Sequence, residues 1–222
     1  MTVVLLHALP LDERMWEGNR GAFAGHEVVA PRLYGLGSSM EEWGRAVLGL
    51  FDGKAVVVGA SMGGYCALAL VRLAPERVQG LALSGSRADA DSPERRAGRA
   101  DTIRLIESEG AAGLWESMRP KLLPDDADTA VVERARELAL AREPEELLRA
   151  VGAVRDRGDS TDVLRGLGDR ALVVLGDRDP FVAPHEVEAA DVPVLPGCGH
   201  LPNLERPREF AAIMTEVLER WT

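Results

Sequence analysis

The sequence predicts an α/β fold built around a mostly parallel sheet. Short apolar runs rich in β-branched residues recur along the chain, and segments with helical spacing separate most of them. The runs are apolar at nearly every position, which is typical of strands buried on both faces of a parallel sheet. The chain has 222 residues, of which 46% are hydrophobic, and this is enough for one domain with a sizeable core.

Six segments have the character of strands. They are Thr2–Leu6, Glu27–Ala30, Ala55–Gly59, Gly80–Ser84, Ala171–Gly176 and Val192–Leu195. Helical patterns that would flank the sheet span roughly 12–24, 40–51, 62–74 and 207–221. We therefore expect a sheet of about six strands with helices on both faces, within a single domain covering 1–222.

One interval, 87–166, breaks this alternation because it contains no strand-like run. Pro93 follows Ser92 in the order typical of a helix start, and Pro144 opens another helical pattern. Helices inserted between two strands are more often a lid over a site than a separate domain. We expect 87–166 to form a helical cap.

The net charge and the hydropathy of the chain argue against several classes of protein. The formal net charge of −10 argues against a nucleic-acid-binding surface. The longest uncharged stretch, between Lys54 and Arg72, is shorter than the about 20 apolar residues that span a bilayer. The first residues carry no basic signal region, and two cysteines do not make a disulfide framework. We expect a cytoplasmic monomer or homodimer with no membrane or nucleic-acid partner.

The most specific chemical signal is Gly59-Ala60-Ser61-Met62-Gly63. It follows an apolar strand and precedes an apolar helix, which is the strand–turn–helix context of a nucleophile elbow. A serine at such a turn stands clear of the sheet, and glycines two positions away let strand and helix approach each other. Ser61 is therefore the candidate nucleophile.

A serine hydroxyl needs a base, and the chain has four histidines. His200 lies in a glycine-containing loop after the last predicted strand, where a base that follows the serine and the acid in chain order is expected. His7 ends the first strand and is interpreted as a hydrogen-bonded structural residue. His26 and His185 lie in less suitable segments.

The acid has two candidates, Asp177 and Asp179, which follow the predicted strand Ala171–Gly176. We favour Asp179, which stands three residues past Gly176 and precedes Pro180. We expect only one of the two carboxylates to reach the histidine, and Pro180 favours an extended conformation at Asp179 that helps to fix the direction of its side chain.

The remaining candidate site residues would bind the substrate. The backbone N–H groups of Leu9 and Met62 are the predicted oxyanion hole. Predicted apolar pocket residues are Trp115, Met118, Phe181 and Leu201. No cluster has metal-ligand spacing, and the lone glycine pair at 35 and 37 does not make a dinucleotide site, so we expect neither metal nor cofactor.

These segments resemble the α/β-hydrolase family over nearly the whole chain. The resemblance is carried by LLHALPLDERMW, the GLGSS segment at 35–39, GASMGGY, VLGDRDPFVAP and GCGHLPNLERP. Within the family the chain looks like the small serine esterase and 3-oxoadipate enol-lactonase-like branches. The resemblance implies Ser61, Asp179 and His200 as a catalytic triad and a helical cap over the pocket. Many members have two opening antiparallel strands that this chain lacks, which again implies six strands.

The expected function is hydrolysis of a carboxylic ester through an acyl-enzyme intermediate. A small, apolar ester or lactone is the expected substrate, since the predicted cap is apolar and the sequence shows no basic clamp. Alternatives are a C–C hydrolase or lyase, an enzyme like the hydroxynitrile lyases, or a ligand-sensing regulator that retains the triad.

Overall fold

The computed structural model describes residues 1–189 and 191–221. Within them, six strands form one sheet in the order β2-β1-β3-β4-β5-β6, and every neighbouring pair is parallel. The strands are β1 (Thr2–Leu6), β2 (Glu27–Val29), β3 (Ala55–Ala60), β4 (Val78–Ser84), β5 (Ala171–Gly176) and β6 (Val194–Leu195). The predicted fold class is confirmed, with a sheet that is parallel throughout.

The strands divide the core into two layers because successive side chains point to opposite faces. Val4 and Leu6 of β1 belong to a cluster that includes residues of α1 (Met40–Leu48) and α2 (Met62–Leu73). Val3 and Leu5 pack on the other face, against residues of α8 (Pro207–Trp221). All five residues of β1 are buried, as expected for a strand covered on both faces.

Most of the predicted flanking helices are α-helices, but the segment predicted over 12–24 is a 3-10 helix, η1 (Glu13–Phe23). Gly18 and Gly21 lie within it, and glycine lowers the stability of an α-helix. η1 packs against α8 on one face of the sheet. The shorter elements are η2 (Pro75–Arg77), η3 (Gly168–Arg170), η4 (Pro184–Glu186) and α7 (Pro202–Glu205).

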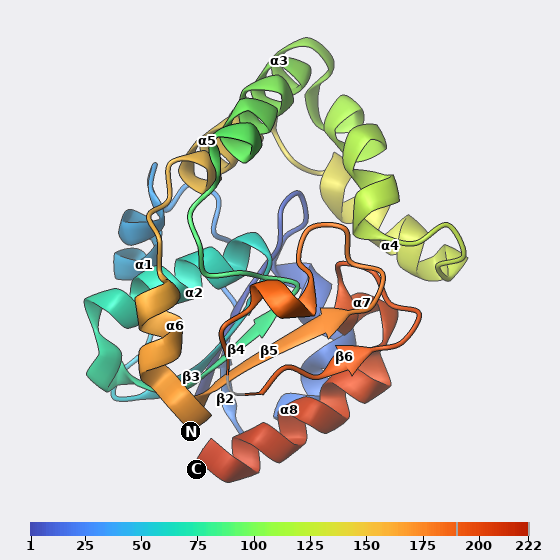
Figure 1. Cartoon of the computed structure of the whole chain (residues 1–222). Helices are drawn as coiled ribbons and strands as arrows, with labels where there is room; N and C mark the ends of the chain where they lie inside the picture. The colour runs from blue at the N-terminus through green and yellow to red at the C-terminus, as the bar shows by residue number, and fades with distance from the viewer. Residues whose placement is uncertain (190, 222) are drawn as a thin grey trace.

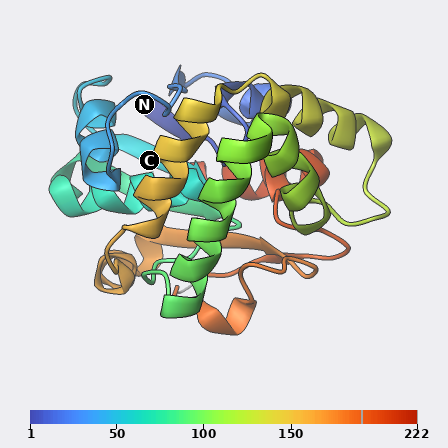
Figure 2. The same ribbon diagram turned by 90° about the horizontal axis from the view of Figure 1, so that it is seen from above.

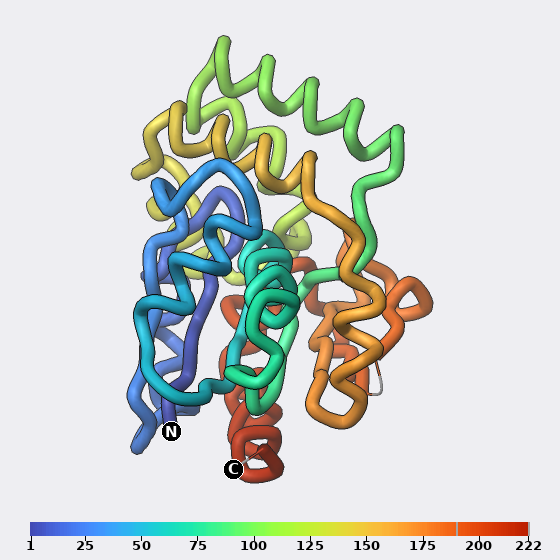
Figure 3. Tube along the Cα trace, turned by 90° about the vertical axis from the view of Figure 1, so that its left-hand side faces the viewer, coloured from blue at the N-terminus to red at the C-terminus, as the bar shows by residue number. Residues whose placement is uncertain are grey.

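Three long helices lie over the carboxyl ends of the strands: α3 (Pro93–Leu122), α4 (Thr129–Leu140) and α5 (Pro144–Arg155). Figures 1 and 2 show them as a layer above the sheet. α3 is kinked at Gly110, whose φ of +65° is open to glycine at little cost. α6 (Thr161–Leu167) lies lower and packs beside α2, at the side of the sheet (Figure 3). No helix in the described ranges is long and apolar enough to cross a membrane.

Candidate active site

Ser61 stands at a strained turn between β3 and α2. Its φ of 48° is the only positive value among the described non-glycine residues, and such a conformation costs of order 1–3 kcal/mol. Three hydrogen bonds hold the turn. The Ser61 amide donates to the Ser84 carbonyl at 2.8 Å, and the Ser61 carbonyl accepts from the Gly64 amide (2.9 Å) and the Ser86 hydroxyl (3.0 Å). The surrounding fold therefore maintains the strain.

Glycines make room for this turn where strand and helix come together. A Cβ atom on Gly59 would lie 2.6 Å from the carbonyl oxygen of Gly63. A Cβ atom on Gly63 would overlap the carbonyl oxygen of Leu6 on the neighbouring strand β1. The two glycines of the motif are therefore required sterically, because a side chain at either position would prevent the close approach of strand and helix.

Three side chains from distant parts of the chain meet at the carboxyl edge of the sheet. The Nε2 atom of His200 lies 2.8 Å from the Ser61 hydroxyl oxygen, and its Nδ1 atom lies 2.8 Å from Oδ2 of Asp179. Asp177, the other acid candidate, instead accepts a hydrogen bond from the Cys198 amide at 3.3 Å. The structure therefore brings together the serine, the histidine and the favoured aspartate.

The Asp179 carboxylate is oriented by its own loop. Its side chain is fully buried, and Oδ1 accepts hydrogen bonds from the amides of Phe181 (2.8 Å) and Val182 (3.3 Å). These contacts leave Oδ2 for the imidazole of His200. Both carboxylate oxygens therefore have partners, and Oδ2 is held against the Nδ1 atom of His200.

His200 is held by contacts that the sequence analysis missed. The half-buried carboxylate of Glu205 accepts hydrogen bonds from the amides on both sides of the histidine, those of Gly199 (2.8 Å) and Leu201 (3.0 Å). Burial raises the pKa of Glu205. The His200 amide also donates to the carbonyl of Leu122 at the end of α3, at 3.1 Å. The only sequence signal for Glu205 is that it is the first charged residue after His200.

The amides predicted as an oxyanion hole lie at the same pocket. Leu9 and Met62 both line it beside Ser61. Met62 is the first residue of α2, so its N–H has no acceptor within the helix, and the positive end of the helix dipole lies there. Within 1–189 and 191–221, neither amide donates to a protein acceptor. Both are free to bind a negatively charged oxygen.

His7 supports the loop that carries Leu9. Its Nε2 atom accepts a hydrogen bond from the Leu33 amide at 2.9 Å, so Nδ1 bears the proton and faces the Ala8 carbonyl at 3.2 Å. Burial lowers the pKa of His7 to about 4. A neutral, fully bonded imidazole fits the structural role predicted for it.

The pocket beside Ser61 has about 490 Å³ of empty volume, including the part open to solvent. Two of the four predicted apolar residues, Met118 and Phe181, line it. The centroid of the Phe181 ring lies 4.6 Å from the centroid of the His200 imidazole. The other two predictions are wrong. Trp115 and Leu201 are 3% and 0% exposed and pack in the core cluster on the α8 side of the sheet. Neither residue is among those that line the pocket, although Leu201 follows His200 directly and Trp115 lies three residues before Met118.

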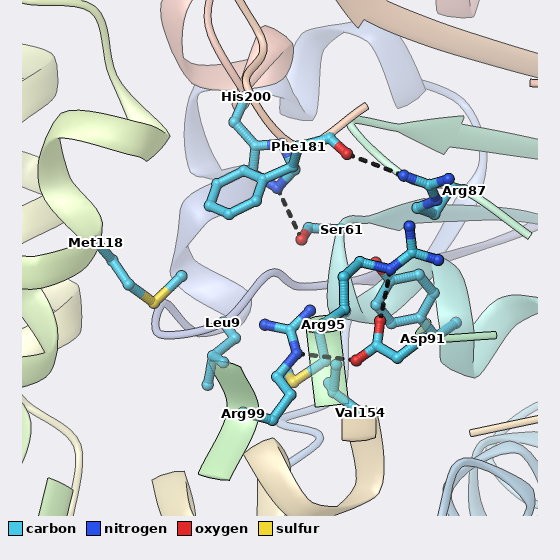
Figure 4. Close-up of a pocket in the computed structure, with 12 residues that line it drawn as sticks. Leu9, Ser61, Arg87, Asp91, Arg95, Arg99, Met118, Val154, Phe181 and His200 are labelled. Atoms are coloured by element: carbon cyan, nitrogen blue, oxygen red, sulfur yellow. Dashed lines mark hydrogen bonds and ion pairs between the residues drawn. The ribbon is translucent and has the colours of Figure 1, made fainter. Parts of the chain in front are cut away.

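Basic residues line one side of the pocket, so the expectation of a site without a basic clamp is also wrong. Arg87, Arg95 and Arg99 line the pocket together with Asp91. Figure 4 shows Arg95 and Arg99 on the side of Ser61 away from His200. Arg95 and Arg99 are four residues apart in α3, a spacing that places side chains on one helix face and was available in the sequence.

The chain matches the family model described as "Alpha/beta hydrolase family" over residues 3–213. It belongs to the alpha/beta hydrolase family. This agrees with the serine at a strand–turn–helix elbow and with the parallel sheet described above. The resemblance stated from the sequence is confirmed.

Relatives within the alpha/beta hydrolase family include esterases. A pimeloyl-[acyl-carrier protein] methyl ester esterase from Aromatoleum aromaticum is 31% identical over 97% of this chain and 97% of its own. The dihydrolipoyllysine-residue acetyltransferase component of the acetoin cleaving system of Pseudomonas putida is 30% identical over 98% of this chain, which spans only 63% of that protein's length.

Solved structures of an esterase and an enol-lactonase are also similar to this chain. A thermophilic esterase from Thermogutta terrifontis superposes with a TM-score of 0.90 and 32% identity, covering 100% of this chain and 90% of its own. The enol-lactonase from Burkholderia xenovorans LB400 superposes with a TM-score of 0.85 and 25% identity, over 98% of this chain and 91% of that one.

Proposed function

We propose that this carboxylic-ester hydrolase acts through an acyl-enzyme formed on Ser61. The observation that supports this most directly is the continuous set of contacts from the Ser61 hydroxyl through His200 to Asp179, with 2.8 Å at each step. A histidine base that is held by a third group activates a serine hydroxyl, which is otherwise a weak nucleophile. The esterase and enol-lactonase names of the relatives support a carboxylic ester or lactone as substrate.

In the first half-reaction the Ser61 oxygen attacks the acyl carbonyl carbon while His200 takes the hydroxyl proton on Nε2. The carbonyl oxygen becomes negatively charged and is bound by the amides of Leu9 and Met62, each worth about 3 kcal/mol in the transition state. His200 then gives the proton to the leaving alcohol. Asp179 orients the imidazole and stabilises its charged form.

In the second half-reaction a water molecule attacks the acyl-enzyme, with His200 again as the base. The carboxylic acid leaves and Ser61 regains its proton. In this proposal the helices within 87–166 form the cap that covers the acyl group. Met118 of α3 and Val154 of α5 line the pocket from that side.

The test is hydrolysis of short p-nitrophenyl esters by the wild type and by Ser61→Ala. We expect the variant to lose at least about a thousandfold in kcat while its unfolding midpoint stays within a few degrees, since removing one hydroxyl disturbs little packing. Ser108→Ala, at an exposed position on α3, is the matched control and should be fully active.

Two results would contradict the proposal. One is turnover by Ser61→Ala near the wild-type level. The other is the failure of an acyl adduct to appear on Ser61 by mass spectrometry during single-turnover hydrolysis. An adduct that forms without turnover would instead indicate a ligand-sensing protein.

A further inference from the structure

A buried carboxylate organises the basic side of the pocket. The Asp91 side chain is 0% exposed and makes ion pairs with three guanidinium groups, those of Arg157 (2.8 Å), Arg99 (3.1 Å) and Arg95 (3.3 Å). One carboxylate balances one of these charges. Arg157, at 4% side-chain exposure, is the closest of the three and is itself buried against the Tyr65 ring, 3.9 Å from its centroid.

The neighbouring acids do not remove the excess of positive charge. Asp89 pairs with Arg87 and Arg95, and Glu186 pairs with Arg87 at 3.2 Å. The cluster therefore holds four guanidinium groups against three carboxylates. A half-closed pocket with this balance attracts an anion.

Most guanidinium nitrogens in the cluster already have acceptors. Arg87 donates to Asp89, Glu186 and the Phe181 carbonyl. Arg157 donates to the carbonyls of Val154 and Asp89.

Arg99 differs from them. It uses only Nε, which donates to Asp91, and its two terminal nitrogens have no acceptor among the residues that the structure describes. Figure 4 shows these nitrogens pointing away from Asp91 into the pocket, between Leu9 and Arg95.

This orientation has a chemical consequence. The two terminal nitrogens of a guanidinium group form a planar fork that matches the two oxygens of a carboxylate. Arg99 shares the pocket with Ser61, and the apolar side chains of Leu9, Met118 and Val154 line the same space. A suitable acyl group thus has an ester carbonyl at one end, an apolar chain and an anion at the other end.

We propose that Arg99 binds a carboxylate at the far end of the acyl group, so that the preferred substrates are half-esters of dicarboxylic acids. This inference rests on the proposed ester hydrolysis at Ser61. Asp91 holds the Arg99 guanidinium by its Nε side and leaves the fork free. Arg99 is thereby a specificity-determining residue, and the reaction itself remains that of Ser61 and His200.

The test compares two esters of the same shape. Monomethyl adipate carries the terminal carboxylate, and methyl 6-methylheptanoate replaces that carboxylate with an isopropyl group. We expect the wild type to prefer monomethyl adipate by at least about tenfold in kcat/KM. In Arg99→Leu this preference should fall by about 10- to 100-fold, and Arg99→Lys should restore part of it. Arg96→Leu, an exposed arginine on the same helix, should leave the preference unchanged.

A second measurement does not depend on the folding of the Arg99 variants. Calorimetry with Ser61→Ala should show tighter binding of monomethyl adipate than of its isopropyl analogue, with a difference that shrinks as salt is added.

Equal use of the two esters by the wild type, equal binding by Ser61→Ala, or an unchanged preference in folded Arg99→Leu would each overturn this inference and leave ester hydrolysis standing. Failure of the wild type to hydrolyse either methyl ester or any p-nitrophenyl ester would overturn the proposed function itself.

Discussion

Replacing Asp179 with asparagine tests how the acid is used, because the new amide has no satisfactory orientation. If its oxygen stays with the amides of Phe181 and Val182, its NH2 group faces Nδ1 of His200. The imidazole must then accept on Nδ1 and carry its proton on Nε2, where it cannot take the proton of Ser61. If the amide turns over, its NH2 group faces two N–H donors.

The expected cost follows from the loss of the correct tautomer. We expect kcat of Asp179→Asn to fall about ten-thousandfold, equivalent to about 5.5 kcal/mol in the transition state. Asp177→Asn is the matched control. Among the residues that the structure describes, its side chain accepts only from the Cys198 amide, at 3.3 Å, and an asparagine oxygen can accept the same bond, so kcat should stay within about threefold.

The assay is steady-state hydrolysis of p-nitrophenyl acetate, with circular dichroism to show that both variants are folded. More than a tenth of wild-type kcat in Asp179→Asn would refute the reasoning. A larger loss in Asp177→Asn than in Asp179→Asn would move the acid to Asp177.

Three further predictions concern residues around the site. Because burial lowers the pKa of His7 to about 4, the unfolded chain takes up a proton first as the pH falls. The free energy of unfolding should therefore lose about 3 kcal/mol between pH 6.5 and pH 4 in urea titrations, and a His7→Gln variant with the same pH dependence would contradict this. Glu205→Gln should lower kcat and reduce the free energy of unfolding by about 1–3 kcal/mol, because one of the two amides that donate to Glu205 loses its acceptor. An unchanged kcat would show that this contact does not position His200. Trp115→Ala should lower the free energy of unfolding by about 3–5 kcal/mol and leave the preference for acyl-chain length unchanged. Met118→Ala should alter that preference and lower the free energy of unfolding by less. The opposite pattern would show that Trp115 lines the pocket.

The sequence by itself determined the parallel sheet, because strands buried on both faces must be apolar at nearly every position. It also determined the turn at Ser61, since glycines at 59 and 63 are required by contacts within and beside a single strand–turn–helix unit. The segments carrying Asp179 and His200 were predictable for the same local reason: each follows the end of a strand or predicted strand. In a parallel sheet, those ends meet at one edge.

Only the tertiary structure decided which side chains face the pocket. Trp115 and Met118 are three residues apart on α3, yet the first is buried in the core and the second lines the pocket, because their exposure depends on where the kinked helix lies over the sheet. The basic side of the pocket has the same origin. Arg99 and Arg157 both pair with Asp91 although they lie far apart in the sequence, so no local sequence pattern predicts that they come together. Local patterns report contacts between near neighbours, whereas the packing of helices over the sheet depends on many distant contacts at once.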